Sequence, residues 1–594
     1  MKIKGRIKKI VVGVIILSLL FVFRASQSQG DSEPDFLSMI QRNCVPNAKD
    51  RSPELYIVYQ EDVLTSSEKN TTFACSHGFP WESDTCIPLI LYGKGIKRGA
   101  ILKEEASLED ITQTLAKLLF VDPPEESNGR VLTEALKLWH KNDTKEPKLI
   151  RKLLTPRVAL VFTLDQCRAD YLTNPQIKDA LAFTRSVLAG KGAQYLNARL
   201  SYSVSRTAVS HAVIGTGATP GINGIIGNNI NLGSDFPLAF DDQPLHSMNM
   251  FNLLTPTLAD VMDLEKFNNP VIISMSPYAR AALGMGGHGA AYSPQSDHDI
   301  IIELLSDVGL PYTNDEYFSL PMYLKYSKEN PIRIDQWLLD AYSVDIHNTY
   351  WTESTVVKDN SPYTVPNYNT IKGPQGVFPD GTLFSFSHPS VTDGAEQPVE
   401  AYQLWDESVP FPNNDYYEDT MYTPFFQLWA VDMLLKTMEA EGVGMDCIPD
   451  LVYYNFKCLD KVGHRYGVNS PEVYTILYYI DYCLKKIKYW LDKNIGKNNY
   501  VMIVTADHGA HNSYGDRILY TGDLFDAVES RFSKEIILND PSEGKPFDDM
   551  IYLDQEILDA KGHTQEDVAG FVEESFSDHV YEVYTKDEIF QNQE

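Results

Sequence analysis

Positive charge is scarce in this sequence relative to negative charge. The chain has 594 residues, with 51 Lys and Arg against 81 Asp and Glu, and its formal net charge at pH 7 is −30. A general nucleic-acid-binding protein needs a basic face that displaces counterions. The composition therefore excludes that class, and we expect no nucleic-acid-binding surface.

Long apolar runs are also nearly absent, which excludes a transporter with several membrane spans. The one candidate, residues 10–23, follows five basic residues and is shorter than the roughly 20 residues of a spanning helix. A basic start, a short apolar core and a polar end indicate a secretory signal within residues 1–30, with an uncleaved membrane anchor as the alternative. We expect an extracellular, periplasmic or cell-surface protein of the secretory pathway, which contacts a membrane only through this segment if it is uncleaved. Sequons at Asn70 and Asn142 would accept glycans in a eukaryotic host.

Cysteine is sparse, and no pair has the CxxC spacing. There are seven cysteines, so a zinc site built from paired thiolates is not expected. In an oxidising compartment some would pair and at least one would stay free. Cys75 and Cys86 could bridge, but the sequence does not fix the connectivity.

The remaining composition predicts a large packed α/β domain. Hydrophobic residues make up 43% of the chain, which excludes general disorder. Short apolar runs alternate with helical patterns, which is typical of a mostly parallel central sheet sandwiched by helices. The predicted strands are 55–59, 87–92, 158–164, 269–275, 451–456 and 500–506, and the predicted helices are 111–119, 175–188, 426–441 and 471–492. An irregular stretch from about 290 to 425 predicts a cap or insertion.

Polar residues follow four of the predicted strands. Asp165, Asp460, Asp507 and Arg280 each come after a different strand, and His464 and His508 lie close by in the sequence. In an open parallel sheet, ligands bind beyond the carboxyl ends of the strands. Carboxylates and imidazoles suit zinc, and residues at i and i+4 share a helix face. The sequence therefore favours a metal site at this edge, although each motif taken alone is also common as a turn or a helix cap.

A glycine-rich stretch with several hydroxyl groups lies between these motifs. It includes Ser203, Ser205 and Thr207 and extends to Asn228. Taken alone, this stretch is better explained as a surface loop with helix-capping hydroxyls.

Taken together and in order, these motifs make the chain resemble the alkaline phosphatase superfamily. The resemblance is to phosphate-irrepressible alkaline phosphatases and to type I phosphodiesterase / nucleotide pyrophosphatase relatives. It rests on residues 164–171 (LDQCRADY), 206–211 (RTAVSH), 219–228 (TPGINGIIGN), 286–288 (GGH), 460–464 (DKVGH) and 505–509 (TADHG). It implies an alkaline phosphatase-like fold and a two-zinc hydrolase of phosphoric esters.

One motif of the family stands at the opposite end of this chain. Relatives carry a zinc-binding motif of the form HGxPxxxDTxxP late in their chains, and here residues 77–88 (HGFPWESDTCIP) reproduce it. Residues 31–136 would then correspond to the family's C-terminal part, 137–156 to a linker, and 157–594 to the remainder of the same catalytic domain. The resemblance therefore implies a circular permutation, with His77 as a metal ligand.

The resemblance also implies residue roles. Asp165, Asp507 and His508 would hold one Zn²⁺, and Asp460, His464 and His77 would hold the other. Thr207 would bind the first ion and attack phosphorus, forming a phosphothreonine intermediate. Asn228 and Arg280 would contact phosphoryl oxygens.

The substrate stays open between a monoester and a diester. Monoesterase relatives often have Lys-x-Arg before the GGH text, whereas this chain has Tyr278-Ala-Arg280. Losing a cation weakens the preference for the more negative monoester. We expect a small phosphate ester as substrate and favour a phosphomonoesterase, with a phosphodiesterase or nucleotide pyrophosphatase as the alternative. A sulfatase is disfavoured because Cys167 lacks the C-x-P-x-R context, and a non-catalytic secreted binding protein remains a weaker reading.

Overall fold

The computed structural model describes most of the chain outside its N-terminus and cap. The described ranges are 35–45, 51–66, 74–137, 155–303, 375–377, 383–385 and 421–591, with short gaps at 176, 234–235, 243–246, 249, 251, 289–298, 422–423, 513–516 and 540–549. The expected signal or anchor, both sequons, nearly all of the 137–156 linker and most of the 290–425 cap lie outside the described residues. Within the cap, β12 (Gln375–Val377) and β13 (Leu383–Ser385) pair antiparallel.

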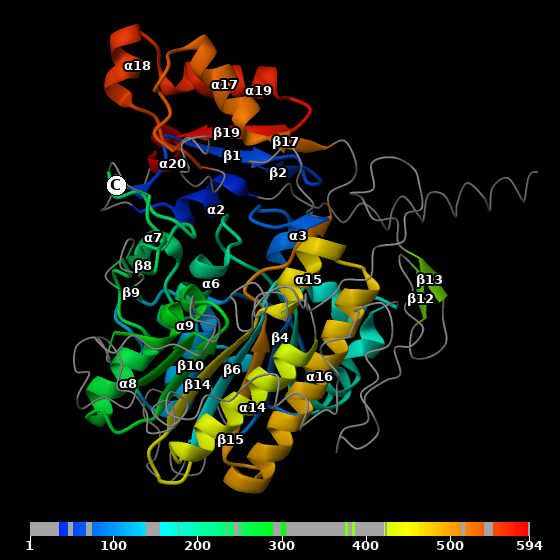
Figure 1. Cartoon of the computed structure of the whole chain (residues 1–594). Helices are drawn as coiled ribbons and strands as arrows, with labels where there is room; N and C mark the ends of the chain where they lie inside the picture. The colour runs from blue at the N-terminus through cyan, green and yellow to red at the C-terminus, as the bar shows by residue number, and fades with distance from the viewer. Residues whose placement is uncertain are drawn as a thin grey trace, which may run out of the picture.

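An eight-stranded mixed sheet forms the centre of the molecule (Figure 1). Strand β4 is antiparallel to both of its neighbours, and the remaining five pairs of neighbouring strands are parallel. The expected mostly parallel sheet is therefore confirmed. In spatial order the strands are β11 (Asp299–Glu303), β10 (Ile272–Ser276), β14 (Asp450–Phe456), β6 (Val158–Leu164), β15 (Tyr500–Thr505), β4 (Leu89–Gly93), β7 (Ala193–Ala198) and β5 (Ala100–Ala106).

Helices flank this sheet, as the alternating pattern predicts. Strands β6, β10, β14 and β15 are buried along their whole length, as expected for apolar runs covered on both faces. One group of helices in mutual contact comprises α14 (Pro424–Ala440), α15 (Cys458–Tyr466) and α16 (Pro471–Leu491). Another comprises α4 (Glu109–Leu119), α6 (Thr207–Thr216), α8 (Leu258–Lys266) and α9 (Ala279–Gly286).

The helix predicted over 175–188 is broken in the structure. The chain forms a 3₁₀ turn at Lys178–Leu181 and a π-helical turn at Thr184–Ala189. The carboxylate of Asp481 in α16 accepts the backbone N–H groups of Phe183 and Thr184, at 2.8 and 2.7 Å. These bonds replace helical ones, so a contact distant in sequence overrides the local pattern.

A second, smaller layer brings the two ends of the described chain together (Figure 1). Strand β1 (Leu55–Tyr59) lies between β18 (Met550–Ile551) and β19 (Val580–Thr585) and is antiparallel to both. Helices α17 (Thr521–Arg531), α18 (Gln555–Lys561) and α19 (Gln565–Ser575) contribute to its separate apolar core. Residues 31–136 thus supply strands to both sheets. A circular permutation is a difference in segment order between this chain and its relatives, so it stays a prediction.

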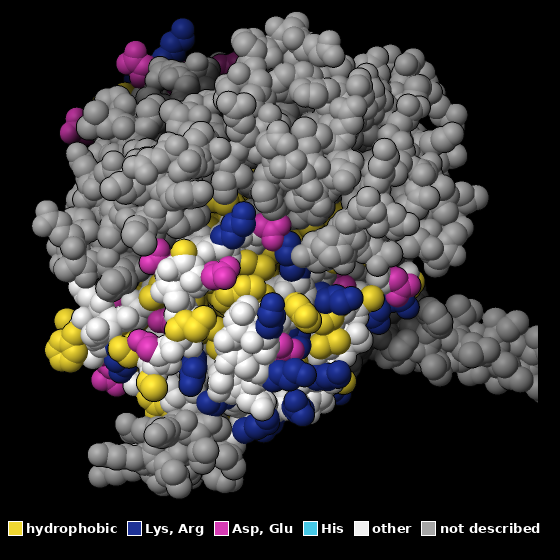
Figure 2. All heavy atoms as spheres, turned by 60° about the horizontal axis from the view of Figure 1, so that its bottom comes forward, with side chains coloured by type: hydrophobic (Ala, Val, Ile, Leu, Met, Phe, Trp, Pro, Cys, Tyr) yellow, Lys and Arg dark blue, Asp and Glu magenta, His cyan; other side chains and the backbone are white. Residues whose placement is uncertain are grey.

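Basic side chains are concentrated on one face of the molecule. Lys and Arg side chains gather on the face at the bottom of Figure 1, so the charge of −30 is unevenly distributed (Figure 2). Among the described residues, which begin at 35, no helix is both long and apolar enough to span a membrane.

All seven cysteines are free, so the bridge considered between Cys75 and Cys86 is not formed. The sulfur of Cys75 instead lies 3.7 Å from Oε1 of Gln166.

Strand β4 should be essential to the stability of the central sheet. Leu91 is fully buried in β4, whereas Leu196 in neighbouring β7 is 55% exposed. We expect Leu91→Ala to lower the free energy of unfolding by about 2–5 kcal/mol, through lost burial and a cavity. Leu196→Ala should change it by less than about 0.5 kcal/mol. Urea denaturation of both variants checks this, and equal losses would contradict the central position of β4.

Candidate metal centre

Three neighbouring parallel strands carry the acidic residues of the candidate site. Asp165 directly follows β6, and Asp507 follows β15 with one residue, Ala506, between them. Asp460 lies in the first turn of α15, which starts soon after β14. Because β14, β6 and β15 are adjacent and parallel, their carboxyl ends meet at one edge. The sequence prediction of three convergent carboxylates therefore agrees with the geometry.

The first donor group consists of Asp165, Asp507 and His508, which are all fully buried. The Nε2 atom of His508 lies 3.2 Å from Oδ2 of Asp507 and 3.8 Å from Oδ1 of Asp165. The donor atoms of these residues all lie within 4.8 Å of one another, as a single ion requires.

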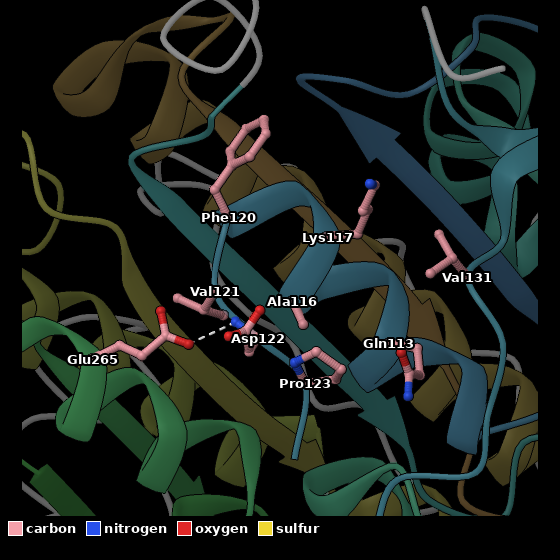
Figure 3. Close-up of a pocket in the computed structure, with 9 residues that line it drawn as sticks. All are labelled: Gln113, Ala116, Lys117, Phe120, Val121, Asp122, Pro123, Val131 and Glu265. Atoms are coloured by element: carbon pink, nitrogen blue, oxygen red, sulfur yellow. Dashed lines mark hydrogen bonds between the residues drawn. The ribbon is translucent and has the colours of Figure 1, made fainter. Parts of the chain in front are cut away.

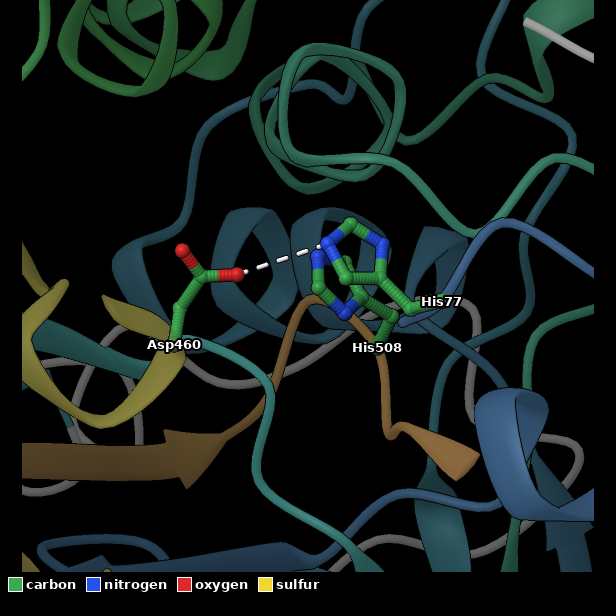
Figure 4. Close-up of side chains that lie close together, drawn as sticks. All are labelled: His77, Asp460 and His508. Atoms are coloured by element: carbon green, nitrogen blue, oxygen red, sulfur yellow. Dashed lines mark ion pairs between the residues drawn. The ribbon is translucent and has the colours of Figure 1, made fainter. Parts of the chain in front are cut away.

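The second donor group that the resemblance implies consists of Asp460, His464 and His77, whereas the donor atoms that lie within 4.8 Å of one another here are those of His77, Asp460 and His508. Oδ1 of Asp460 lies 3.2 Å from Nε2 of His464 and 3.4 Å from Nε2 of His77. The ring of His77 also stacks on that of His508 at 3.7 Å, so the two groups touch (Figure 4). The structure thus brings together all six residues that the resemblance implies as metal ligands, although two of them are 387 positions apart, His77 and His464.

All three histidines are oriented in the same way. Their Nδ1 atoms lie 2.8–2.9 Å from backbone carbonyl oxygens, of Ser205 for His77, Cys75 for His464 and Gly509 for His508. A carbonyl oxygen can only accept, so Nδ1 carries the proton and donates it. The Nε2 atoms then face the carboxylates, and a carbonyl partner at Nδ1 is what metal-ligating histidines usually have.

Unsatisfied buried atoms support the fit of a cation. Oδ1 of Asp460, Oδ2 of Asp507 and Nε2 of His508 are buried and have no hydrogen-bond partner. Buried polar atoms are rarely left in this state. A divalent cation bound to both nitrogen and oxygen donors would satisfy all three, and zinc accepts that donor set.

The electrostatics of the site favour positive charge. Burial lowers the pKa of His508, but the carboxylates of Asp507 and Asp165 outweigh it and raise the pKa to about 9. Burial and the charge of Asp507 raise the pKa of Asp165 to about 7. Burial lowers the pKa of Lys457, but Asp165 and Asp460 raise it more. The protein therefore concentrates negative charge where a cation would bind.

The loop that carries His77 is held by a buried carboxylate. Oδ2 of Asp84 accepts the backbone N–H groups of Gly78 and Phe79, each at 3.1 Å, and Oδ1 lies 2.9 Å from Nδ1 of His511. Burial raises the pKa of Asp84, but His511 and these bonds lower it more. Strand β3 (Cys75–Ser76) also pairs with β16 (His511–Asn512). The spacing between His77 and Asp84 in the HGxPxxxD motif therefore corresponds to a loop that the Asp84 carboxylate closes.

Gly78 in this loop leaves no room for a side chain. Its φ is +131°, and a Cβ atom would lie 2.7 Å from the guanidinium of Arg206. The backbone conformation therefore favours glycine, and a side chain here would also displace the guanidinium of Arg206.

Thr207 and Asn228 meet at the start of α6. Thr207 is the first residue of that helix and is 2% exposed. Oδ1 of Asn228 accepts the N–H of Ala208 at 3.1 Å, which places its amide beside Thr207. His211 lies one turn further along, with Nδ1 2.7 Å from the carbonyl oxygen of Thr207.

Arg280 lies in the first turn of α9, as expected from the strand before it. Its Nε atom is buried without a hydrogen-bond partner, and its guanidinium lies 4.7 Å from the ring centre of Tyr278. Nζ of Lys461 lies 5.2 Å from the same ring. The charge of Arg280 also acts on Lys457, so the arginine belongs to the electrostatic environment of the centre.

Sequence reasoning missed two residues of the centre, Lys457 and His511. Nζ of Lys457 lies 3.0 Å from Oδ1 of Asp165 and 2.7 Å from Oδ2 of Asp460. Lys457 lies directly after a buried strand and three residues before Asp460, but a lysine in such a place is usually solvated, so the sequence alone does not assign it to the centre. His511 follows Asp507 by four residues, but its partner Asp84 is 427 positions away, so no local pattern indicates the pair.

A cavity elsewhere has no comparable chemistry. It measures about 400 Å³ and lies between α4 and α8 (Figure 3). No histidine, cysteine or residue of the donor groups lines it, and the backbone N–H of Asp122 donates to Glu265 across it at 2.7 Å.

His77 should be necessary for metal binding. We expect His77→Ala to lower the affinity for Zn²⁺ by more than about 10–100-fold, the usual cost of losing a ligand's hydrogen-bonding partner, because the second donor group loses the ligand nitrogen itself. His563→Ala is the matched control, since His563 packs on Phe532 and lies 3.8 Å from Asp567. Isothermal titration of metal-stripped protein measures both, and an unchanged affinity in His77→Ala would remove His77 from the ligand set.

Comparisons with known proteins agree with the motifs. The family model of type I phosphodiesterase / nucleotide pyrophosphatase matches residues 159–247 and 326–593. Alkaline phosphatase PhoV of Synechococcus elongatus is 26% identical over 372 residues, which are 60% of this chain and 59% of that protein. Alkaline phosphatase PafA of Elizabethkingia meningoseptica is 26% identical over 383 residues, 61% of each chain. The chain thus matches about three fifths of the length of these relatives.

A crystal structure of wild-type alkaline phosphatase PafA is also similar, with a TM-score of 0.49, 21% identity and coverage of 74% of this chain and 80% of that one. The matched range of the family model leaves out residues 31–136, so the origin of that segment is not tested by it. Because the model matches more than half of the chain, this protein belongs to the type I phosphodiesterase / nucleotide pyrophosphatase family, and its recognition as a member of the alkaline phosphatase superfamily is confirmed.

Proposed function

We propose that this protein is a metal-dependent phosphoric ester hydrolase, of the alkaline phosphatase-like phosphomonoesterase type. The observation that carries the proposal is the position of the Thr207 hydroxyl. It is buried at the start of α6 and accepts a hydrogen bond from Lys457 at 3.2 Å, beside two carboxylates that contact the same ammonium. Nucleophile, helix N-terminus and metal donors therefore converge at one place.

The family resemblance implies two zinc ions, and the two donor groups are the residues that would hold them. Asp165, Asp507 and His508 form the first group, and the second group is completed by His77. Bound zinc would supply Lewis acid chemistry by neutralising charge on the phosphoryl and leaving-group oxygens.

The residues of the chain would perform the steps in order. Oγ1 of Thr207 attacks phosphorus as the bond to the ester oxygen breaks, and the alcohol leaves. Water then cleaves the phosphothreonine, which releases phosphate and restores the hydroxyl. The amide of Asn228 donates to a phosphoryl oxygen, and Arg280 binds non-bridging oxygens through its fork of donors, one of which is now buried without a partner.

A diesterase or nucleotide pyrophosphatase is the second candidate. The observation that favours it is Tyr278, which stands where monoesterase relatives carry lysine and which contacts Arg280 through its ring. An aromatic face there accepts an uncharged or stacked substituent more readily than an additional negative charge.

The location of the protein also belongs to this proposal. The N-terminal segment described from the sequence supports a protein of the secretory pathway, at the cell surface, in a periplasm or outside the cell. Its substrate would be a small phosphate ester in that compartment.

The role of Thr207 is tested by removing its hydroxyl. We expect Thr207→Ala to lower kcat for p-nitrophenyl phosphate by about 10³-fold or more, because no nucleophile remains. Thr207→Ser keeps a hydroxyl and should retain measurable turnover. The decisive control is bound metal, which should be similar in both variants, and full activity of Thr207→Ala would exclude Thr207 as the nucleophile.

The substrate class is tested at Tyr278. Rates with p-nitrophenyl phosphate and bis-p-nitrophenyl phosphate give a monoester-to-diester ratio for each variant. We expect Tyr278→Lys to raise that ratio about tenfold, because the added cation favours the more negative ester. Tyr278→Phe keeps the ring and should leave the ratio near that of the wild type. A ratio that does not change in Tyr278→Lys would show that Tyr278 does not set the preference.

A further inference from the structure

The edge of the central sheet opposite the metal centre carries exposed basic side chains (Figure 2). Arg157 directly precedes β6, and its N–H donates to the carbonyl oxygen of Asn499, just before β15, at 2.6 Å. Strands β5 and β7 run in the same direction as β15, because β4 is antiparallel to both β7 and β15, so their amino ends lie at this edge too. The exposed basic residues here, which we call the basic edge, are Lys97, Arg98, Arg157, Lys191, Lys493 and Lys497.

The six cations of the basic edge form no ion pair within the part of the chain that the structure describes. This contrasts with the net charge of −30, which offers many possible partners. Of the acidic residues nearby, Asp492 pairs with Lys488 at 2.8 Å, and Asp446 accepts the N–H of Ile448. Burial and the charge of Arg157 lower the pKa of neighbouring Lys94. Positive charge is therefore left uncompensated at this edge, which favours an anionic partner.

Large apolar side chains are exposed along the same edge. Met445 is 60% exposed in the loop before β14, and the carbonyl oxygen of adjacent Gly444 accepts a bond from Arg157 at 3.4 Å. Tyr489, near the end of α16, is 72% exposed, and Phe267, which follows α8 and precedes β10, is 86% exposed. A soluble polyanion would be bound by the cations alone. Basic residues together with exposed aromatic and apolar side chains are typical of a surface that binds the headgroup layer of a bilayer.

The negative charge of the whole protein does not prevent such a contact. The seven residues of β6 separate the basic edge from the metal centre by about 23 Å. The screening length in 0.1 M salt is only about 10 Å, so acidic residues on distant faces are screened while the basic edge is in contact. Because the two edges lie at opposite ends of the same strands, contact at one leaves the other open to solvent.

We propose that the basic edge docks on an anionic lipid surface and holds the metal centre on the side away from the membrane. The Lys and Arg side chains bind headgroup phosphates, and Phe267, Met445 and Tyr489 enter the headgroup layer. This peripheral contact is additional to the one expected through the N-terminal segment. It does not depend on the proposed hydrolase activity.

Cys447 provides a reporter of this contact, because it follows Met445 by two residues and is the one exposed cysteine of the seven. The full chain is labelled there with an environment-sensitive fluorophore and mixed with vesicles of phosphatidylcholine, with or without phosphatidylglycerol. We expect the emission to shift to the blue with the anionic vesicles only. The signal reports contact of this edge, whereas binding through the N-terminal segment is common to all variants.

Removing charge from the basic edge should weaken the contact. We expect the triple variant Lys97→Gln, Lys493→Gln and Lys497→Gln to bind anionic vesicles about 100-fold more weakly, at about fivefold for each cation near the surface. The matched control removes three exposed cations from the second layer and should bind as the wild type does. Its substitutions are Arg531→Gln, Lys534→Gln and Lys561→Gln.

A substitution of Phe267 distinguishes a bilayer from a polymer. Phe267 has a φ of +58°, which asparagine also adopts, so Phe267→Asn keeps the backbone conformation. We expect it to bind anionic vesicles about tenfold more weakly, because less apolar surface leaves water.

Several results would overturn the inference. These are no shift with anionic vesicles, an equal shift with phosphatidylcholine alone, or undiminished binding by the triple variant. Binding of dextran sulfate without a response to vesicles would indicate an anionic polymer as the partner and would also overturn it. Turnover of p-nitrophenyl phosphate in solution should be the same in all variants, which shows that they are folded and keeps this test separate from the proposed function.

Discussion

The repulsion among Asp165, Asp460 and Asp507 is the constraint on which this structure depends. The three carboxylates are buried within the reach of one ammonium and three imidazoles. Buried carboxylates are stable only when positive charge or hydrogen-bond donors surround them. The fold supplies a lysine from within the same strand-end layer and three histidines whose Nε2 atoms face the carboxylates. Such a centre is unfavourable without cations, and this is the physical reason to regard it as a metal site.

The fold produces this concentration of charge by simple topology. Adjacent parallel strands place their carboxyl ends at one edge, so residues far apart in sequence become neighbours there. The contribution of His77 requires more, because its loop comes from the first described part of the chain. Strand β4 inserts beside β15, and the pair Asp84 and His511 closes the loop over the centre. The same segment also supplies β1 to the second sheet. This part of the chain therefore contributes both to the stability of the fold and to the assembly of the site.

Much of this arrangement could be predicted from the sequence, because it depends on local patterns. Asp165 and Asp507 follow short apolar runs that are typical of buried strands, and the motif around His77 has a specific spacing. Lys457 could not be assigned in advance, since a lysine after a strand is usually solvated and only the fold shows which carboxylates surround it. The break in the helix at 175–188 likewise comes from Asp481, whose partners are about 300 positions away. Interactions of this kind are set by tertiary packing, which a single sequence does not reveal.

The central claim is that the N-terminal segment that carries His77 and the later segment that carries His464 share one metal centre. Anomalous diffraction at the zinc absorption edge, from crystals of the full chain grown with Zn²⁺, tests it most directly. Our account predicts an anomalous peak about 2.0–2.1 Å from Nε2 of both His77 and His464, which is the usual zinc–imidazole distance. A peak that contacts the strand-end carboxylates but leaves His77 outside its coordination shell would contradict the account.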